Sequence, residues 1–118
     1  MGGFCVGKLI KNIEHSRVLS LAGEVAYQTG QVVSKTLVQN GRHSLTLFAF
    51  EKGEEISSHA SEGDALVFVL DGVGKITLNG KEEHLLHSGE AIVMPAKVPH
   101  AVYAVERFKM LLTVSFPS

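Results

Sequence analysis

Residues 53–72 read GEEISSHASEGDALVFVLDG and carry both the turn signals and the apolar run that decide the fold. His59 and Ser61 alternate, so on an extended strand their side chains face the same way. Glycines at both ends of the stretch favour tight turns. The apolar run before Gly72 is rich in valine, leucine and phenylalanine, which is typical of a buried strand. The stretch therefore predicts strands joined by a polar turn, with His59 close to that turn.

Segments typical of strands continue on both sides of this stretch. Residues 31–38, QVVSKTLV, and 43–50, HSLTLFAF, flank a polar turn at 39–42 and predict a hairpin. The further predicted strands are ALVFVL at 65–70, KITL at 75–78, AIVM at 91–94, AVYAV at 101–105 and RFKMLLTVS at 107–115. The last strand alternates, and its apolar face consists of Phe108, Met110, Leu112 and Val114. Short strands punctuated by glycine predict an all-β sandwich or barrel.

Only the N-terminal region offers a candidate for helix. Between Ile13 and Ala26 we expect at most a short helical turn, formed by Val18, Leu19, Leu21 and Ala22 and packed on the sheet. Residues 1–30 are therefore assigned to an N-terminal arm and packing segment, and residues 31–118 to the β-barrel. The two parts form one structural domain, because 118 residues can bury one core but not two.

Composition and charge exclude several classes of function. Apolar residues make up 45% of the chain and charged residues 19%, with a formal net charge of -1. This balance lacks the basic excess that phosphate binding needs, so we expect no nucleic-acid partner. No segment approaches about 18 consecutive apolar residues, so we expect no membrane span. Cys5, on the N-terminal arm, is the only cysteine. A lone cysteine excludes an intrachain disulfide and favours a reducing, cytoplasmic location.

Two of the predicted strands are apolar on both faces. In HSLTLFAF at 43–50 and ALVFVL at 65–70, apolar side chains occupy positions that would point away from the core as well as into it. A face of this kind must also be covered. A second subunit would cover it most economically, and we therefore predict a homodimer.

The turn signal Asn79-Gly80 leaves the position of His84 open. A two-residue loop would set Ile76 opposite Glu83, which mixes apolar and charged side chains on one face. A loop with an odd number of residues would instead move His84 to the other face. The sequence does not decide between the two.

Two motifs resemble those of the cupin family. The first family pattern, G-x5-H-x-H-x3,4-E-x6-G, resembles residues 53–72, with His59 at the first histidine position. The second, G-x5-P-x-G-x2-H-x3-N, resembles GEAIVMPAKVPH at 89–100, with His100 at its histidine. The resemblance spans residues 53–104 and implies a small single-domain jelly-roll barrel. If both motif strands face inward, His59 and His100 converge on the lumen of that barrel.

Several positions depart from the family patterns. In cupins that hold a metal, the usual ligands are two histidines and a carboxylate from the first motif and one histidine from the second. The departures here are Ser61 at the second histidine, Ala65 at the carboxylate, Lys97 at the glycine of the second motif and Ala104 at its asparagine. Only His59 and His100 remain of the ligands that the resemblance implies.

These two histidines are the candidate metal ligands. Two neutral imidazoles can begin a site for iron, nickel, zinc, manganese or copper, whereas an open catalytic site generally has three protein ligands. Glu62 and Asp64 are nearby carboxylates that we interpret as turn residues, with Asp64 bonding local backbone. A triad of Ser61 with His59 and Asp64 is not expected, because no nucleophile elbow surrounds the serine.

The other histidines are interpreted as ordinary surface or strand residues. His84 and His87 are separated by two residues, which points them to opposite faces of a strand, so they are not expected to share a metal. His15 and His43 lie outside both motifs.

Two hypotheses for function follow, and the missing ligands favour the first. In the first hypothesis, the chain binds a small anionic or polar molecule in the barrel lumen, metal-free or with metal held weakly by His59 and His100. Alternatively, it is a metal-dependent cupin enzyme, like a dioxygenase or isomerase, acting on a small oxygenated substrate. A structural or partner-binding dimer is a third option. The predicted pocket residues are His59, Ser61, Val67, Val69, Ile76, Leu78, His100 and Val102.

Overall fold

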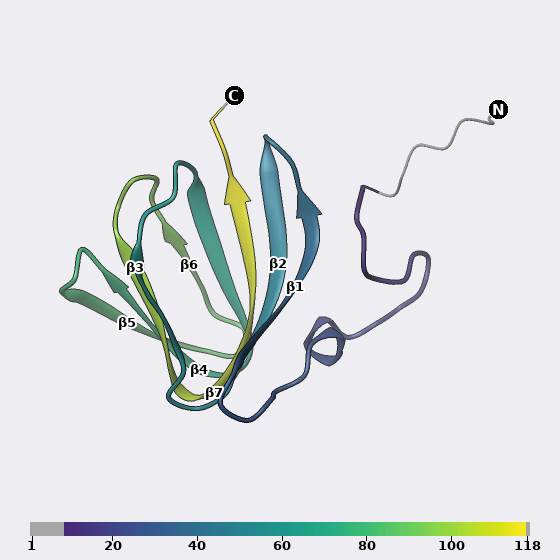
Figure 1. Ribbon diagram of the computed structural model, residues 1–118, viewed down its shortest axis with the longest axis horizontal. Helices are drawn as coiled ribbons and strands as arrows, with labels where there is room; N and C mark the ends of the chain where they lie inside the picture. Colours follow the sequence, from purple (N-terminus) through teal and green to yellow (C-terminus); the bar gives the residue numbers. More distant parts are fainter. Residues whose placement is uncertain (1–8, 118) are drawn as a thin grey trace.

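The computed structural model describes residues 9–117. The elements are η1, a short 3-10 turn (Leu21–Glu24), and the strands β1 (Val32–Gln39), β2 (His43–Phe50), β3 (Glu55–His59), β4 (Asp64–Leu78), β5 (Glu82–His87), β6 (Ala91–Met94) and β7 (His100–Ser115) (Figure 1). None of the helical structure in this range is long and apolar enough to cross a membrane. Cys5 lies outside the described residues, so its place on the arm stays a prediction.

The strands form one antiparallel sheet that folds over into two facing layers. A large layer has the order β1-β2-β7-β4-β6, and a small layer has the order β3-β7-β4-β5. β4 and β7 belong to both layers: residues 64–71 pair with 109–115 in the large layer, and residues 74–78 pair with 100–104 in the small one. Figure 1 shows the layers meeting where these two strands bend and opening away from that point. The prediction of an all-β barrel is confirmed.

The structure corrects the way the chain is divided into strands. ALVFVL and KITL were expected to be separate strands, but both belong to β4, and AVYAV and RFKMLLTVS both belong to β7. The glycines at 72 and 74 do not end the first of these strands. They bend it, and the ladder to β7 continues after register shifts at this point. Each long strand therefore ties the two layers together through its own backbone.

Close packing at the bend requires glycine. Gly72 has φ +79, in the left-handed region that side chains disfavour, and a Cβ built there would lie 1.8 Å from the carbonyl oxygen of Arg107. A Cβ on Gly74 would lie 2.7 Å from the ring of Phe108. The two strands can approach this closely only because β4 carries no side chain at these positions.

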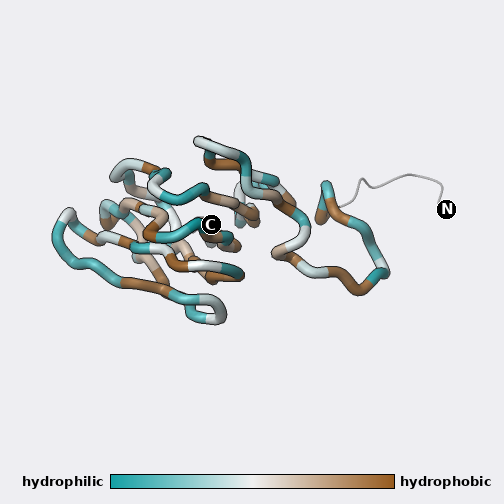
Figure 2. The backbone as a smooth tube through the Cα atoms, turned by 90° about the horizontal axis from the view of Figure 1, so that it is seen from below, coloured by the Kyte–Doolittle hydropathy of each residue, from teal (hydrophilic) through white to brown (hydrophobic). Residues whose placement is uncertain are grey.

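The space between the layers is filled by apolar side chains. The alternating face predicted for the last strand points inward, and Phe108 and Met110 are 0% and 1% exposed. Phe108 stacks on Phe50 of β2, with ring centroids 4.6 Å apart. Brown and teal alternate along much of the barrel in Figure 2, as expected for strands with one buried face. Removing one of these buried aromatic rings would cost about 3 to 5 kcal/mol of stability.

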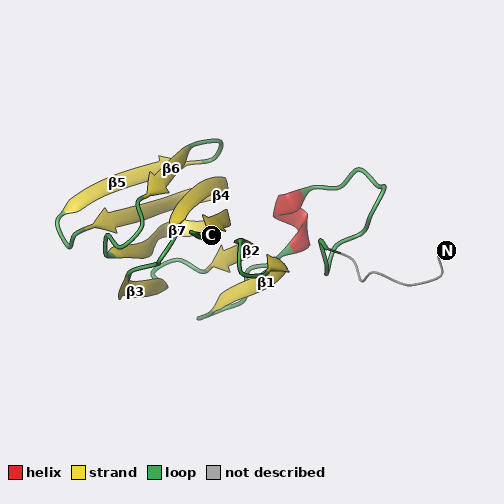
Figure 3. Cartoon of the chain, turned by 90° about the horizontal axis from the view of Figure 1, so that it is seen from above, coloured by secondary structure: helices red, strands yellow, loops and turns green. Residues whose placement is uncertain are grey.

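The outer face of β2 is covered by the chain's own N-terminal segment. Leu47 and Ala49 point outward and are still 0% exposed, because Val25, Leu21 and Ile13 pack against this second apolar cluster. Figure 3 shows η1 and the preceding loop beside β1 and β2. A helical turn is present in the predicted region, at η1, but it begins only at Leu21; Val18 and Leu19 lie before it, and Val18 is 105% exposed and not packed on the sheet. Part of the apolar surface that suggested a second subunit is thus buried within one chain.

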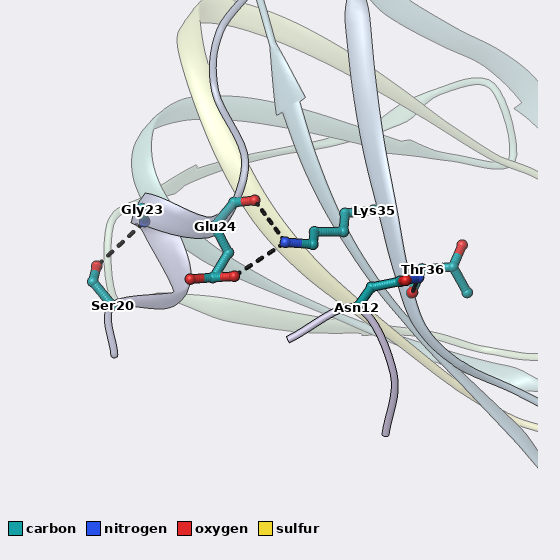
Figure 4. A network of polar contacts seen from close by, with 6 residues as sticks. All are labelled: Asn12, Ser20, Gly23, Glu24, Lys35 and Thr36. Carbon is teal, nitrogen blue, oxygen red and sulfur yellow. Dashed lines mark hydrogen bonds and ion pairs between the residues drawn. The ribbon is translucent and has the colours of Figure 1, made fainter. Parts of the chain in front are cut away.

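Polar contacts anchor this segment to the barrel. Lys35 Nζ on β1 pairs with Glu24 Oε1 at 3.1 Å, and Asn12 Nδ2 donates to the carbonyl oxygen of Thr36 at 2.7 Å (Figure 4). The hydroxyl of Tyr27 donates to Asp71 Oδ2, and the guanidinium of Arg107 lies 4.3 Å from the centroid of the Tyr27 ring. These contacts hold the N-terminal segment to β1 and to the bend of the sheet.

Replacing Gly72 by alanine tests the role of the bend. We expect Gly72→Ala to lower the free energy of unfolding by about 3 kcal/mol or more, because backbone strain adds to a clash with backbone atoms. Gly80→Ala is the matched control, since Gly80 has φ +72 but nothing within 4 Å of its Cβ position. The control should cost only about 1 kcal/mol. Urea unfolding followed by circular dichroism measures both, and equal losses would contradict the account.

Candidate functional site

Pairing of β3 with β7 brings His59 and His100 together. His59 is the last residue of β3, His100 is the first residue of β7, and the two are partners in the ladder. Their ring centroids lie 4.4 Å apart with the rings 66° to one another, so the edge of one ring faces the other. The convergence predicted from the two motifs is present, at the end of the small layer farthest from the bend.

The backbone fixes the tautomer of both rings. His59 Nδ1 lies 3.0 Å from the carbonyl oxygen of Ser57, and His100 Nδ1 lies 3.3 Å from that of Val98. Because a carbonyl oxygen can only accept, each Nδ1 must carry the hydrogen and donate it. In a neutral ring Nε2 then has no hydrogen and keeps its lone pair. The pair therefore presents two hydrogen-bond acceptors, or two potential metal ligands.

The two histidines differ in their exposure to solvent. His59 is exposed, whereas His100 is only 4% exposed. Burial lowers the pKa of His100 below its ordinary value of 6.5; the nearby His59 lowers it further, and the carbonyl oxygen of Val98 acts in the opposite direction. His100 is therefore a neutral imidazole at pH 7, which is the form that accepts a hydrogen bond at Nε2.

His84 faces the interior, which the sequence did not decide. Leu78 pairs with Glu82, so the β4–β5 loop has three residues, and Ile76 pairs with His84. The odd loop was the alternative that moves His84 to the other face. Its Nε2 lies 2.7 Å from Glu82 Oε2, and His84 lines a hollow of about 170 Å³ between β5 and β6.

His87 behaves as predicted from its spacing to His84. It pairs with Val73 on the opposite face of β5 and is exposed. Its backbone N–H donates to Glu90 Oε1 at 2.8 Å, and this bond, followed by the bond from the His87 ring, lowers the pKa of the glutamate. The two histidines of β5 therefore do not share a ligand.

The predicted apolar lining lies on the inner faces, as part of the packed core. Its members are Val67, Val69, Ile76, Leu78 and Val102, with exposures between 0% and 8%. Phe50, Phe108 and Met94 pack in the same cluster. These side chains belong to the buried cluster on the inner faces, and the histidine pair lies at one end of the strands that carry it. A pocket lined by them stays a prediction.

Ser61 lies outside the strand that carries His59. β3 ends at His59, so the alternation assumed for the two residues does not extend to the serine. Its hydroxyl accepts the backbone N–H of Gly63 at 3.1 Å, and its carbonyl accepts the N–H of Lys97 at 2.7 Å. Lys97 has φ 66, a left-handed conformation that explains why the family pattern has glycine there. Ser61 thus stabilises the turn before β4.

The residues present do not complete a metal site. The side chain of Ala65 has no atom that could bind a metal, and the hydroxyl of Ser61 is engaged in the turn. Asp64 Oδ1 accepts the N–H of Ala96 at 2.8 Å, and Asp64 and Glu62 line a separate hollow beside the C-terminal residues. Within residues 9–117, no group of three or more His, Cys, Asp or Glu side chains could hold an ion. The two imidazoles alone fall short of the three protein ligands of an open catalytic site.

The sequence profile of the cupin domain family matches residues 46–115, which is more than half of the chain. The chain belongs to the cupin family. The prediction of a small jelly-roll cupin, made from the two motifs, is thereby confirmed.

Solved structures agree with this assignment. A conserved protein of unknown function from Streptococcus pyogenes is 46% identical, with a TM-score of 0.93 over 97% of this chain and 99% of that chain. A cupin superfamily protein from Desulfitobacterium hafniense is 32% identical, with a TM-score of 0.87 over 92% and 98%. No curated protein matches the chain.

Similarity also extends to an enzyme, at the level of the fold alone. Salicylate 1,2-dioxygenase from Pseudoaminobacter salicylatoxidans is 20% identical, with a TM-score of 0.66 over 80% of this cupin and 27% of that chain. One architecture can carry many activities, so this likeness does not transfer the reaction.

The lowered pKa of His100 predicts how stability changes with pH. The unfolded chain has the ordinary value near 6.5, so below that pH it binds a proton that the folded protein resists. Stability should fall as the pH drops below about 6.5, by at most about 1.4 kcal/mol per pH unit for this group. A His100→Gln variant should have a shallower slope in urea unfolding between pH 7 and pH 5. Identical slopes would contradict the assignment.

Proposed function

We propose that this cupin binds a small molecule at the rim of its barrel through the Nε2 atoms of His59 and His100, without a resident metal. The observation that carries the proposal is the contact of both rings with the backbone: both Nδ1 atoms lie within 3.3 Å of a backbone carbonyl oxygen, so in neutral rings both Nε2 atoms are acceptors. Two acceptors on adjoining rings match a ligand that donates two hydrogen bonds.

The chemistry of the pair limits the class of ligand. Neutral imidazole acceptors favour hydroxyl, amide or ammonium groups, whereas an anion without hydrogens offers them nothing to accept. Two partly buried apolar side chains come from the same parts of the chain as the histidines: Ile56 lies on β3 with His59, and Val98 lies in the loop just before His100. We infer a small polar molecule, rich in hydroxyl or amide groups, with a modest apolar part.

A metal-dependent enzyme is the second candidate function. In its favour, an Nδ1–H donated to a backbone carbonyl is the arrangement that orients metal-binding histidines in proteins. Against it, the carboxylate position is Ala65, and the hydroxyl of Ser61 is engaged in its turn. His59 and His100 would hold such an ion, and a bound metal would polarise an oxygen atom of the substrate.

Metal content distinguishes the two candidates. We expect protein purified without an affinity tag or chelator to contain far less than one metal ion per chain by elemental analysis, even after incubation with ferrous, nickel or zinc ions. The physical reason is that two imidazoles bind a divalent ion too weakly to keep it through purification. Near-stoichiometric metal that His59→Ala and His100→Ala both abolish would overturn the metal-free proposal.

Ligand binding is tested by thermal shift. A panel of small neutral polyols and amides should contain compounds that raise the melting temperature of the parent protein, since binding to the folded state alone stabilises it. The shift should disappear in His59→Ala and persist in the control His87→Ala, because His87 is exposed on the opposite face. A shift that survives His59→Ala would place the ligand elsewhere.

A further inference from the structure

We propose that the ligand of the histidine pair is a hydroxylated amine, whose ammonium group is held by Glu82 and His84 on the other side of the small layer. This assignment rests on the proposed function, because His59 and His100 hold the hydroxyl end of the same molecule. Glu82 and His84 add its second end and its charge.

Strand register places the two polar pairs on one face of the small layer. His59 on β3 is the ladder partner of His100 on β7. Leu78 on β4 is the partner of both His100 and Glu82, so these side chains emerge on the face that carries the buried core. One row thus crosses the small layer from β3 to β5. Neighbouring strands lie about 4.8 Å apart, so about 10 Å separates the backbones of His100 and Glu82.

The middle of this face is apolar. Leu78 is only 8% exposed. In the row nearer to the bend, Ile76 is the partner of both Val102 and His84, and the two apolar side chains are 1% and 2% exposed. The two polar pairs therefore stand on either side of an apolar strip. A ligand that contacts both pairs has polar ends and an apolar middle.

Glu82 and His84 form the second polar pair. Nε2 of His84 lies 2.7 Å from Oε2 of Glu82. Because an ionised carboxylate can only accept, this Nε2 carries the hydrogen, and in a neutral ring Nδ1 keeps its lone pair. The side chains of Glu82 and His84 are 63% and 40% exposed, so a ligand can reach both.

A hollow beside His84 provides room for a small polar group. Its volume is about 170 Å³, and Ile92 and Glu90 also line it. The hollow lies between β5 and β6, which each pair with β4. A second carboxylate thus borders the space next to Glu82 and His84, which favours a cation there over an anion.

The atoms that these contacts leave free select for a donor with positive charge. Nε2 of His59 and of His100 accept hydrogen bonds, and the carboxylate of Glu82 accepts them with a negative charge. Lys75, on the neighbouring strand, points to the opposite face and pairs with Glu83 at 3.5 Å. A neutral polyol would satisfy the histidine pair equally well but would form no ion pair with Glu82.

Titrations of the full chain with aminohexanol and with hexanediol test the proposal. The two probes have the same length and share one hydroxyl group, and they differ only in an ammonium group against a second hydroxyl. Proton–nitrogen NMR spectra at pH 7 give both affinities. The amine should bind about three- to fivefold more tightly than the diol, which is the gain expected from an exposed ion pair.

Three variants assign this preference to its residues, and each replaces an exposed side chain, so all should fold. Glu82→Gln should remove the preference with little effect on the diol, because the amide keeps the shape but not the charge. Glu83→Gln is the matched control, since it removes the same charge from the next residue, on the opposite face of β5. His59→Ala should weaken the binding of both probes.

The outcomes separate this proposal from the histidine site itself. A diol that binds through His59 with no preference for the amine would overturn the charged end and leave the proposed function intact. A preference that Glu83→Gln also removes would exclude Glu82 as its source. Amine binding that Glu82→Gln abolishes and His59→Ala leaves unchanged would contradict a ligand that bridges the two pairs. Absence of binding by both probes would rule out the hydroxylated amine, while the panel of polyols and amides still tests the histidine pair.

Discussion

The close approach of β4 and β7 at Gly72 is the constraint on which the rest of the structure depends. No side chain fits between the two backbones there, so the strands can bend together and pass from one layer to the other without ending. The bend lets the layers face each other and encloses the apolar core. It also sets the register of β7, and that register places His100 beside His59. The site is thus a consequence of backbone packing at the opposite end of the small layer.

What remains of the metal-binding pattern is chemically specific. A complete set of ligands would need the carboxylate and the second histidine, and Ala65 and Ser61 occupy those positions. The two remaining imidazoles still have their Nδ1 atoms directed at backbone carbonyl oxygens. Burial lowers the pKa of His100 and keeps its ring neutral, so its Nε2 can accept a hydrogen bond. The backbone thus orients both histidines, while the described residues 9–117 offer no third ligand beside them.

The sequence predicted some of these features and not others, for physical reasons. Alternation and turn residues were enough for an all-β barrel, and motif spacing was enough to bring His59 and His100 together. The side on which His84 lies depends on whether the loop after Leu78 has an even or odd number of residues, which the Asn79-Gly80 signal does not specify. The cover over β2 comes from an N-terminal segment without strong periodicity, and only tertiary packing reveals it.

The tautomeric state of His59 and His100 can be measured directly. Long-range proton–nitrogen NMR correlations of the imidazole rings at pH 7, assigned with the His59→Ala and His100→Ala variants, distinguish a protonated ring nitrogen from one that keeps its lone pair. The account predicts a protonated Nδ1 and an unprotonated Nε2 in both rings. A hydrogen on Nε2 of either ring, or a doubly protonated His100, would contradict it.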